Sequence, residues 1–192
     1  LDFNDLGYMQ RQNYQSADAF VEYDTNGPFS QFNDGFLGMY GWDNETLDFL
    51  NNGRGVGVFA GVQLKNTWRF FTEINVRADY QDDREVEDGA SLERAGGVEL
   101  NLGIDTDGRK PVSAGVFVAP RLHTNGAFTL YSDATLKARP LPQLEFDLVP
   151  NFTYTVGEPR YFSKSDSGGD YLFGKLEAAS LSATLSGTYT FL

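Results

Sequence analysis

The sequence predicts an all-β protein, an antiparallel transmembrane β-barrel of the outer-membrane type. Apolar and polar residues alternate with a period of two along most of the chain, as in strands with one face against an apolar phase. The alternating segments run for roughly ten residues or more, as a tilted bilayer-spanning strand requires. Short and long connections follow each other in strict alternation, as periplasmic turns and extracellular loops do in such barrels. A soluble β-sandwich also alternates, but it has no reason to sort its loops by side.

Composition restricts the class of protein further. Of the 192 residues, 15 % are aromatic and 21 are glycine, which suits strands and tight turns. No apolar run reaches the ~18 residues of a transmembrane helix. The chain has no cysteine, which excludes disulfides and thiol-ligated metal sites. The net charge of −12 argues against nucleic acid as a partner, because phosphate binding relies on clustered Lys and Arg.

The alternation defines roughly nine strands. Residues 68–80, WRFFTEINVRADY, show it most clearly, because the set that starts at Trp68 is mostly apolar and the set that starts at Arg69 carries charges. The first strand is expected at 14–24, and the second, within 29–42, is the least clear. The other strands are expected at 55–65, 98–104, 112–121, 128–139, 144–155 and 180–191.

The connections between these strands are of two kinds. Short turns are expected at 25–28, 65–67, 107–110 and 140–143, and Asp107 and Gly108 are expected to supply the positive-φ residues of a hairpin turn. Longer loops are expected at 43–54, 81–97, 120–126 and 156–170. This order places residues 1–13 on the extracellular side and the end of the last strand on the opposite side. Single-chain outer-membrane barrels have an even number of strands. Residues 1–192 are therefore predicted to be a single β-barrel region that forms part of a larger barrel.

The polar face of the strands would line the lumen of the barrel. Its charged candidates are Arg69, Glu73, Arg77, Asp79, Glu99, Asp105, Lys137, Arg139, Glu145 and Asp147. These residues predict either a polar channel or binding interior, or a salt-bridged set of side chains that fills the barrel. On the outward face, aromatic residues at strand ends predict a girdle at the lipid interface. The girdle candidates are Trp68, Tyr80, Tyr154, Tyr189 and Phe191.

Glycines spaced by two residues in GRGVGVFAG, residues 53–61, are expected on the inward face beside a bulky neighbour such as Phe59. The segment lacks the Gly-Lys-Ser/Thr of a phosphate loop. His123 is the only histidine and is expected in a loop. It cannot by itself build a histidine-based triad or a multi-histidine metal site. We therefore predict that the chain is not an enzyme.

Two loops carry acidic residues. Residues 81–97 are expected to bind divalent cations that bridge to lipopolysaccharide, to fold over the pore, or to form a solvated surface loop, which is the favoured alternative. Asp166 and Asp170 are weak candidates for a loop-bound Ca²⁺ or Mg²⁺, since hard cations take several oxygen ligands. No other cofactor or metal is expected.

Several stretches occur in a specific order. These are LDFNDLGYMQRQN, NGRGVGVFAGVQLKNTWRFFTEINVRADY, GGVELNLGIDTDGRKPVSAGVFV and YLFGKLEAASLSATLSGTYTF. They resemble the C-terminal barrel region of the bacterial family known as domain of unknown function 5916. The resemblance implies an outer-membrane barrel that continues beyond TYTFL and follows an N-terminal domain similar to family 9 carbohydrate-binding modules. That domain is not part of this sequence, and the resemblance assigns no catalytic or ligand-binding residue to the barrel.

We expect an integral barrel of the bacterial outer membrane that acts as a pore or binding barrel for a solute, saccharide-related by the resemblance. The alternative is a structural barrel with a plugged lumen that anchors an envelope assembly. An outer-membrane hydrolase is the remote alternative, because no nucleophile–base pair is visible in the sequence. The expected partners are outer-membrane lipid and lipopolysaccharide, a saccharide or small solute, and an envelope protein.

Overall fold

The structure of the chain, a computed structural model, describes residues 13–25, 27–86, 90–165 and 170–191. Described residues form strands and connections, and none of them belongs to a helix long and apolar enough to span a membrane. The strands are β1 (Gln15–Asp24), β2 (Phe32–Glu45), β3 (Asn51–Leu64), β4 (Arg69–Arg77), β5 (Tyr80–Asp82), β6 (Leu92–Arg94), β7 (Gly97–Asp105), β8 (Val112–His123), β9 (Phe128–Leu141), β10 (Leu144–Lys164) and β11 (Tyr171–Tyr189).

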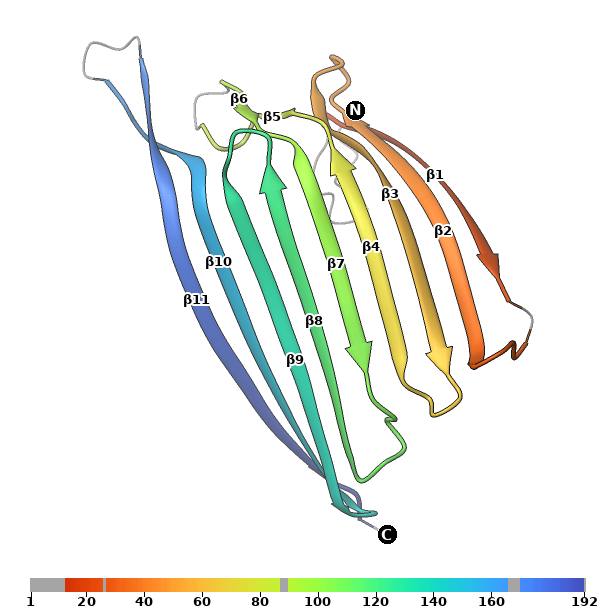
Figure 1. Ribbon diagram of the computed structural model, residues 1–192. Helices are drawn as coiled ribbons and strands as arrows, with labels where there is room; N and C mark the ends of the chain where they lie inside the picture. Colours follow the sequence, from red (N-terminus) through yellow and green to blue (C-terminus); the bar gives the residue numbers. More distant parts are fainter. Residues whose placement is uncertain (1–12, 26, 87–89, 166–169, 192) are drawn as a thin grey trace.

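Nine of these strands form one long, twisted sheet (Figure 1). Its order is β1-β2-β3-β4-β7-β8-β9-β10-β11, and every neighbouring pair is antiparallel. The two remaining strands, β5 and β6, form a separate hairpin within the connection from β4 to β7. The predicted all-β class and the nine antiparallel strands are therefore confirmed. The sheet is open within the described residues, with β1 and β11 as its outer strands.

The strand register gives the sheet one apolar face and one polar face. Ile74 of β4 lies opposite Leu100 of β7, and Glu73 lies opposite Asn101. Because successive side chains of a strand point to opposite faces, each strand adds its apolar set to the same surface. We call the surface with Ile74 the apolar face and the surface with Glu73 the polar face.

No described part of the chain covers the apolar face. The only buried hydrophobic residues among those described are Val86, Ala119 and Ala127. By contrast, Ile74 is 50 % exposed and Val116 is 45 % exposed, although both lie within the sheet. A water-soluble sheet would turn such residues toward a core. The apolar side chains here instead form a continuous exposed surface.

One prediction about the connections is wrong. The connections at one end of the sheet, expected to be long, are 46–50, 78–96, 124–127 and 165–170, and only 78–96 is clearly longer than those at the other end. The predicted loop 156–170 is largely strand, because β10 continues to Lys164 and β11 begins at Tyr171. Register shifts after Val156 and Tyr161 interrupt the period of two without ending the ladder, so the alternation fades where the strands continue. We call the end with these four connections the loop end and the opposite end the turn end.

The connection from β7 to β8 also differs from its prediction. Neither Asp107 nor Gly108 has a positive φ. The Asp107 carboxylate instead accepts hydrogen bonds from the Arg109 backbone N–H at 3.0 Å and from its Nε at 2.8 Å. The turn is thus closed by a side chain, which a two-residue hairpin turn does not require.

Candidate functional site

Nine of the ten predicted lumen charges lie on the polar face. The register pairs Arg69 with Asp105 and Lys137 with Asp147 across neighbouring strands. The remaining members on this face are Glu73, Arg77, Glu99, Arg139 and Glu145. Asp79 is the exception, because it follows the end of β4. Its Oδ1 accepts hydrogen bonds from the Gly96 backbone N–H at 2.6 Å and from Thr124 Oγ1 at 3.0 Å. Asp79 therefore holds two connections together at the loop end.

At the turn end, four of these charges on β9 and β10 neutralise one another. Lys137 Nζ lies 2.8 Å from Glu145 Oε1 and 3.2 Å from Asp147 Oδ1. Arg139 also pairs with Glu145 and donates to the Gly108 carbonyl at 2.7 Å. This cluster ties β9 and β10 to the turn between β7 and β8. Its role is structural, because each charge already has a partner.

A polar pocket of about 590 Å³ opens beside this cluster, lined in part by Arg69, Asp105 and Arg109. Asp107 borders it, and the Arg109 side chain and then the Arg109 backbone N–H, both donating to the carboxylate, hold the pKa of Asp107 well below its usual range. Asp107 as a residue is only 7 % exposed. The pocket is lined mainly by polar and charged residues, and no aromatic ring lines it.

Aromatic rings of β2 and β3 lie flat over glycines on the polar face. A Cβ at Gly57 would meet the Tyr40 ring at 2.5 Å, and one at Gly55 would meet the Trp42 ring at 2.5 Å. In the same way, the Phe59 ring covers Gly38. The prediction of bulky neighbours holds for Gly55, Gly57 and Gly61, whereas nothing lies within 4 Å of a Cβ at Gly53, and the expected neighbour Phe59 covers Gly38 instead. Their partners come mainly from β2, which was the least clear strand in the sequence because its rings lie on the polar face.

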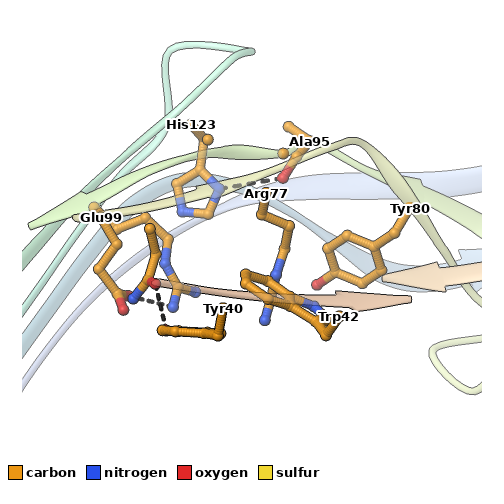
Figure 2. A pocket seen from close by; sticks show the side chains of 11 residues that line it. Tyr40, Trp42, Arg77, Tyr80, Ala95, Glu99 and His123 are labelled. Atoms are coloured by element: carbon orange, nitrogen blue, oxygen red, sulfur yellow. Dashed lines mark hydrogen bonds and ion pairs between the residues drawn. The ribbon is translucent and has the colours of Figure 1, made fainter. Parts of the chain in front are cut away.

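At the loop end, these rings border a second pocket, which we call the Arg77 pocket. It has a volume of about 260 Å³ and is lined by Tyr40, Trp42, Asn75, Arg77, Tyr80, Ala95, Gly96, Gly97, Glu99, Arg121 and His123. The guanidinium carbon of Arg77 lies 5.8 Å from the Trp42 ring centroid and 5.5 Å from that of Tyr80. Figure 2 shows the Arg77 side chain directed toward these two rings. Both distances suit a cation–π contact.

A hydrogen-bond network fixes the floor of the Arg77 pocket. The Tyr40 hydroxyl donates to Glu73 Oε1, and Asn101 Nδ2 donates to Glu73 Oε2 at 2.8 Å. Arg121 forms an ion pair with Glu99 across β8 and β7. Side chains locked in this way give a preorganised surface, since little rotamer freedom remains to be lost when a ligand binds.

The connection 78–96 forms one wall of this pocket and reaches across the sheet. Arg94 Nη2 lies 3.2 Å from Asp82 Oδ2 and 2.9 Å from Glu85 Oε2. Glu85 Oε1 accepts a hydrogen bond from the Tyr161 backbone N–H at 3.1 Å, and Arg94 donates to the Pro159 carbonyl. The hairpin β5–β6 is thereby tethered to β10. The described part of the acidic loop is packed on the protein, contrary to the favoured expectation of a solvated loop, while Glu87 and Asp88 lie outside the described residues.

His123 is the last residue of β8 and not a loop residue as predicted. Its Nε2 lies 3.4 Å from Glu158 Oε1 and 3.5 Å from Thr129 Oγ1, while its Nδ1 faces the Ala95 carbonyl at 3.4 Å. In a catalytic triad the acid and the nucleophile contact opposite ring nitrogens. Here the acid and the hydroxyl share one nitrogen, so this group does not have triad geometry.

The predicted girdle residues take two positions. Tyr154 and Tyr189 lie opposite Leu130 and Leu144, on the apolar face. Trp68 precedes β4 and is 37 % exposed, and Phe191, 87 % exposed, packs its ring 4.9 Å from that of Tyr189. Tyr80 instead lines the Arg77 pocket on the polar face. Its predicted orientation is wrong because β4 ends at Arg77, and the turn at 78–79 breaks the period of two.

Within the described ranges, no three His, Cys, Asp or Glu side chains gather in a way that could hold a metal ion. Of the two weak candidates for a loop-bound cation, Asp166 lies outside the described residues. The Asp170 carbonyl accepts a hydrogen bond from the Ser165 backbone N–H at 2.8 Å, which closes the β10–β11 connection.

Comparisons with known proteins place the chain in a family. The family model described as domain of unknown function (DUF5916) matches residues 1–192. No curated protein and no solved structure matches the chain. Because the family model spans the whole sequence, the chain belongs to the family of domain of unknown function DUF5916.

Proposed function

We propose that this chain is a region of an integral β-barrel of the bacterial outer membrane, and that its polar face lines an aqueous interior that binds or passes a solute. The observation that carries the proposal is the exposed apolar face. Leu102 of β7 is 44 % exposed and Val116 of β8 is 45 % exposed, yet both lie near the middle of the sheet. Lipid is the environment in which a broad apolar surface on long antiparallel strands is favourable.

Membership in an antiparallel barrel would also solve the problem of the outer strands. The unpaired backbone groups of β1 and β11 invite pairing, and closure is the arrangement that removes sheet edges altogether. With nine strands in an antiparallel order, β1 and β11 run in the same direction. An all-antiparallel barrel that contains this sheet therefore needs an odd number of further strands. Lipid and lipopolysaccharide would cover the apolar face, including the girdle residues Tyr154 and Tyr189.

The solute role is supported by the Arg77 pocket. Small-molecule sites are concave and combine aromatic side chains with a few placed polar groups. The Arg77 pocket has this composition, with Tyr40, Trp42 and Tyr80 beside Arg77 and the Glu99–Arg121 pair. The family resemblance favours a saccharide-related solute. The aromatic rings of the pocket agree with it, because flat rings suit the apolar faces of sugars.

A structural role is the second candidate, and a different observation favours it. The connection 78–96 is tethered to β10 through Glu85 and Arg94, and the rings of Phe36 and Phe59 occupy the polar face. An interior filled in this manner would anchor an envelope partner without conducting solute. The turn-end cluster around Glu145, in which every charge is paired, agrees with this alternative as well.

Single-channel recording of the full-length protein in a planar bilayer tests the two candidates. Stepwise conductance that added saccharides reduce would support the solute role. Folded, membrane-inserted protein without conductance would support the structural role and direct the search to protein partners. Failure to insert into bilayers or vesicles, with the protein folded and monodisperse in detergent-free buffer, would overturn both.

A further inference from the structure

We propose that the Arg77 pocket binds an anionic solute in which a carboxylate is attached to a single ring with a flat apolar face. The inference rests on the proposed function in one respect, since the polar face must meet water for a solute to reach it. Beyond the proposed function, it assigns a binding site, the chemical class of the ligand and Arg77 as the residue that recognises the carboxylate. Three features of the pocket support it, namely an unneutralised guanidinium, aromatic walls and a small volume.

The charge of Arg77 is not neutralised within the described part of the chain. Its guanidinium contacts the rings of Trp42 and Tyr80, and it forms no ion pair with a described carboxylate. The second guanidinium of the pocket, Arg121, is paired with Glu99. The lining thus carries two guanidinium groups against one carboxylate. An anion that enters the pocket would supply the missing charge.

Two carboxylates that are close to Arg77 in the sequence, Glu73 and Asp79, are already engaged by different donors. Glu73, below the pocket, accepts hydrogen bonds from Tyr40 and Asn101. Asp79 accepts hydrogen bonds from Gly96 and Thr124. Neither carboxylate is placed to neutralise the Arg77 guanidinium by a direct ion pair. The hydrogen-bond capacity of Arg77 therefore remains for a ligand.

Guanidinium chemistry favours a carboxylate as the anion. The planar group of Arg77 presents a fork of N–H donors that matches the two oxygens of a carboxylate, and stacking on rings holds that fork in one orientation. The guanidinium carbon of Arg77 lies within cation–π distance of both Trp42 and Tyr80, and a guanidinium that stacks on a ring keeps its edge available for hydrogen bonds. This arrangement favours planar, bidentate recognition over a simple attraction to charge.

The walls and volume of the pocket define the rest of the ligand. Tyr40 and Trp42 stack with ring centroids 5.6 Å apart, and together with Tyr80 they offer apolar surface next to Arg77. The volume of about 260 Å³ is below the ~300–1,000 Å³ of drug-sized sites. It accommodates one ring and its carboxylate. Either a sugar acid or an aromatic acid satisfies this chemistry.

Two pairs of probes distinguish a sugar acid from an aromatic acid and test how much the carboxylate contributes to binding. Isothermal titration of the full-length protein in detergent micelles would compare glucuronate with glucose, and benzoate with benzyl alcohol. We expect at least one carboxylate to bind, and its neutral counterpart to bind roughly tenfold more weakly or worse, because a charge-assisted bidentate contact is lost. Binding of glucuronate alone would identify sugar acids, and binding of benzoate alone would identify aromatic acids.

Variants assign the binding to Arg77. Arg77→Gln should weaken binding of the carboxylate roughly tenfold or more, and Arg77→Lys should restore part of the loss, because it keeps the charge without the fork. Arg54→Gln is the matched control. Arg54 also lies at the loop end, on β3, but it belongs to the opposite face and pairs with Asp43 and Glu45. Its substitution should leave the affinity unchanged.

Heat-dependent gel mobility would establish that each variant is folded. Should Arg77→Gln fail to fold, Trp42→Phe, which retains a ring of smaller area, provides the second test and should weaken binding of the carboxylate several-fold. Absence of binding for both carboxylates at up to roughly 20 mM, or equal affinities of Arg77→Gln and the unchanged protein, would overturn the inference. Conductance in bilayers without carboxylate binding would overturn this inference alone, whereas binding by a protein that never inserts would overturn the proposed function alone.

Discussion

The Trp42 ring lies flat on Gly55 of the neighbouring strand, so closely that a Cβ on Gly55 would meet the ring at 2.5 Å. This pair shapes the Arg77 pocket, because the Trp42 ring occupies the space of a missing side chain at Gly55, lines the pocket and lies 5.8 Å from the Arg77 guanidinium carbon. Tyr40 makes the same contact with Gly57. The pocket therefore depends on glycines that themselves carry no chemistry.

A side chain at Gly57 should destabilise the sheet. In Gly57→Val the new Cβ would displace the Tyr40 ring and disturb the hydrogen bond to Glu73. We expect a loss of about 1–3 kcal/mol in the free energy of unfolding, as for other overpacked sites. Urea unfolding in lipid vesicles, followed by fluorescence, measures it. Gly174→Val is the control, because nothing lies within 4 Å of a Cβ there, and equal losses for the two variants would contradict the expectation.

Neighbouring residues of β9 should meet different environments. The chain has no cysteine, so Leu136→Cys on the apolar face and Thr135→Cys on the polar face each introduce a single thiol. A fluorophore at Leu136→Cys should be quenched by nitroxide-labelled acyl chains, and one at Thr135→Cys should not, because adjacent residues of a strand point to opposite faces. Equal quenching at both positions would contradict a lipid-facing apolar surface. The reaction rate of Thr135→Cys with a water-soluble maleimide would then report how open the interior is.

Removing the Glu85 carboxylate should loosen the attachment of the 78–96 connection to β10. Glu85→Gln removes the charge that pairs with Arg94 at 2.9 Å and with Arg160 at 3.4 Å. We expect limited proteolysis within this connection to become several-fold faster, because local opening costs less once a half-buried ion-pair cluster is broken. Glu93→Gln, an exposed change in the same hairpin, should cleave at the original rate. Unchanged cleavage of Glu85→Gln would show that the tether does not depend on this charge.

The turn between β7 and β8 should show a defined dependence on pH. Hydrogen bonds from Arg109 lower the pKa of Asp107, so its folded pKa lies below its unfolded value of about 4. The stabilisation is therefore fully present above the unfolded pKa and is lost as pH falls through the folded pKa. Asp107→Asn should lower stability at neutral pH, and its difference from the unchanged protein should shrink in strongly acid solution. Unfolding midpoints across pH measure this, with Asp18→Asn as the control, and a difference that grows on acidification would contradict it.

The sequence by itself determined the strand content and the two faces. Alternation such as that of 68–80 depends only on the period of a strand, so it predicts which side chains share a face without knowledge of the partner strand. Residues from Arg69 to Arg77 follow that prediction throughout β4. Where a bulge or a turn shifts the period, as after Val156 or before Tyr80, the same rule failed.

Only the tertiary structure decided where the pocket lies and which charges find a partner among the described residues. Trp42, Arg77 and Tyr80 come from β2, β4 and β5, and nothing in their spacing along the chain indicates that they meet. Likewise, Arg139 and Arg77 look alike in the sequence, yet Glu145 pairs with the first while aromatic rings contact the second. The physical reason is that a face is a local property of one strand, whereas a contact depends on register, on bulges and on how a connection folds back over the sheet.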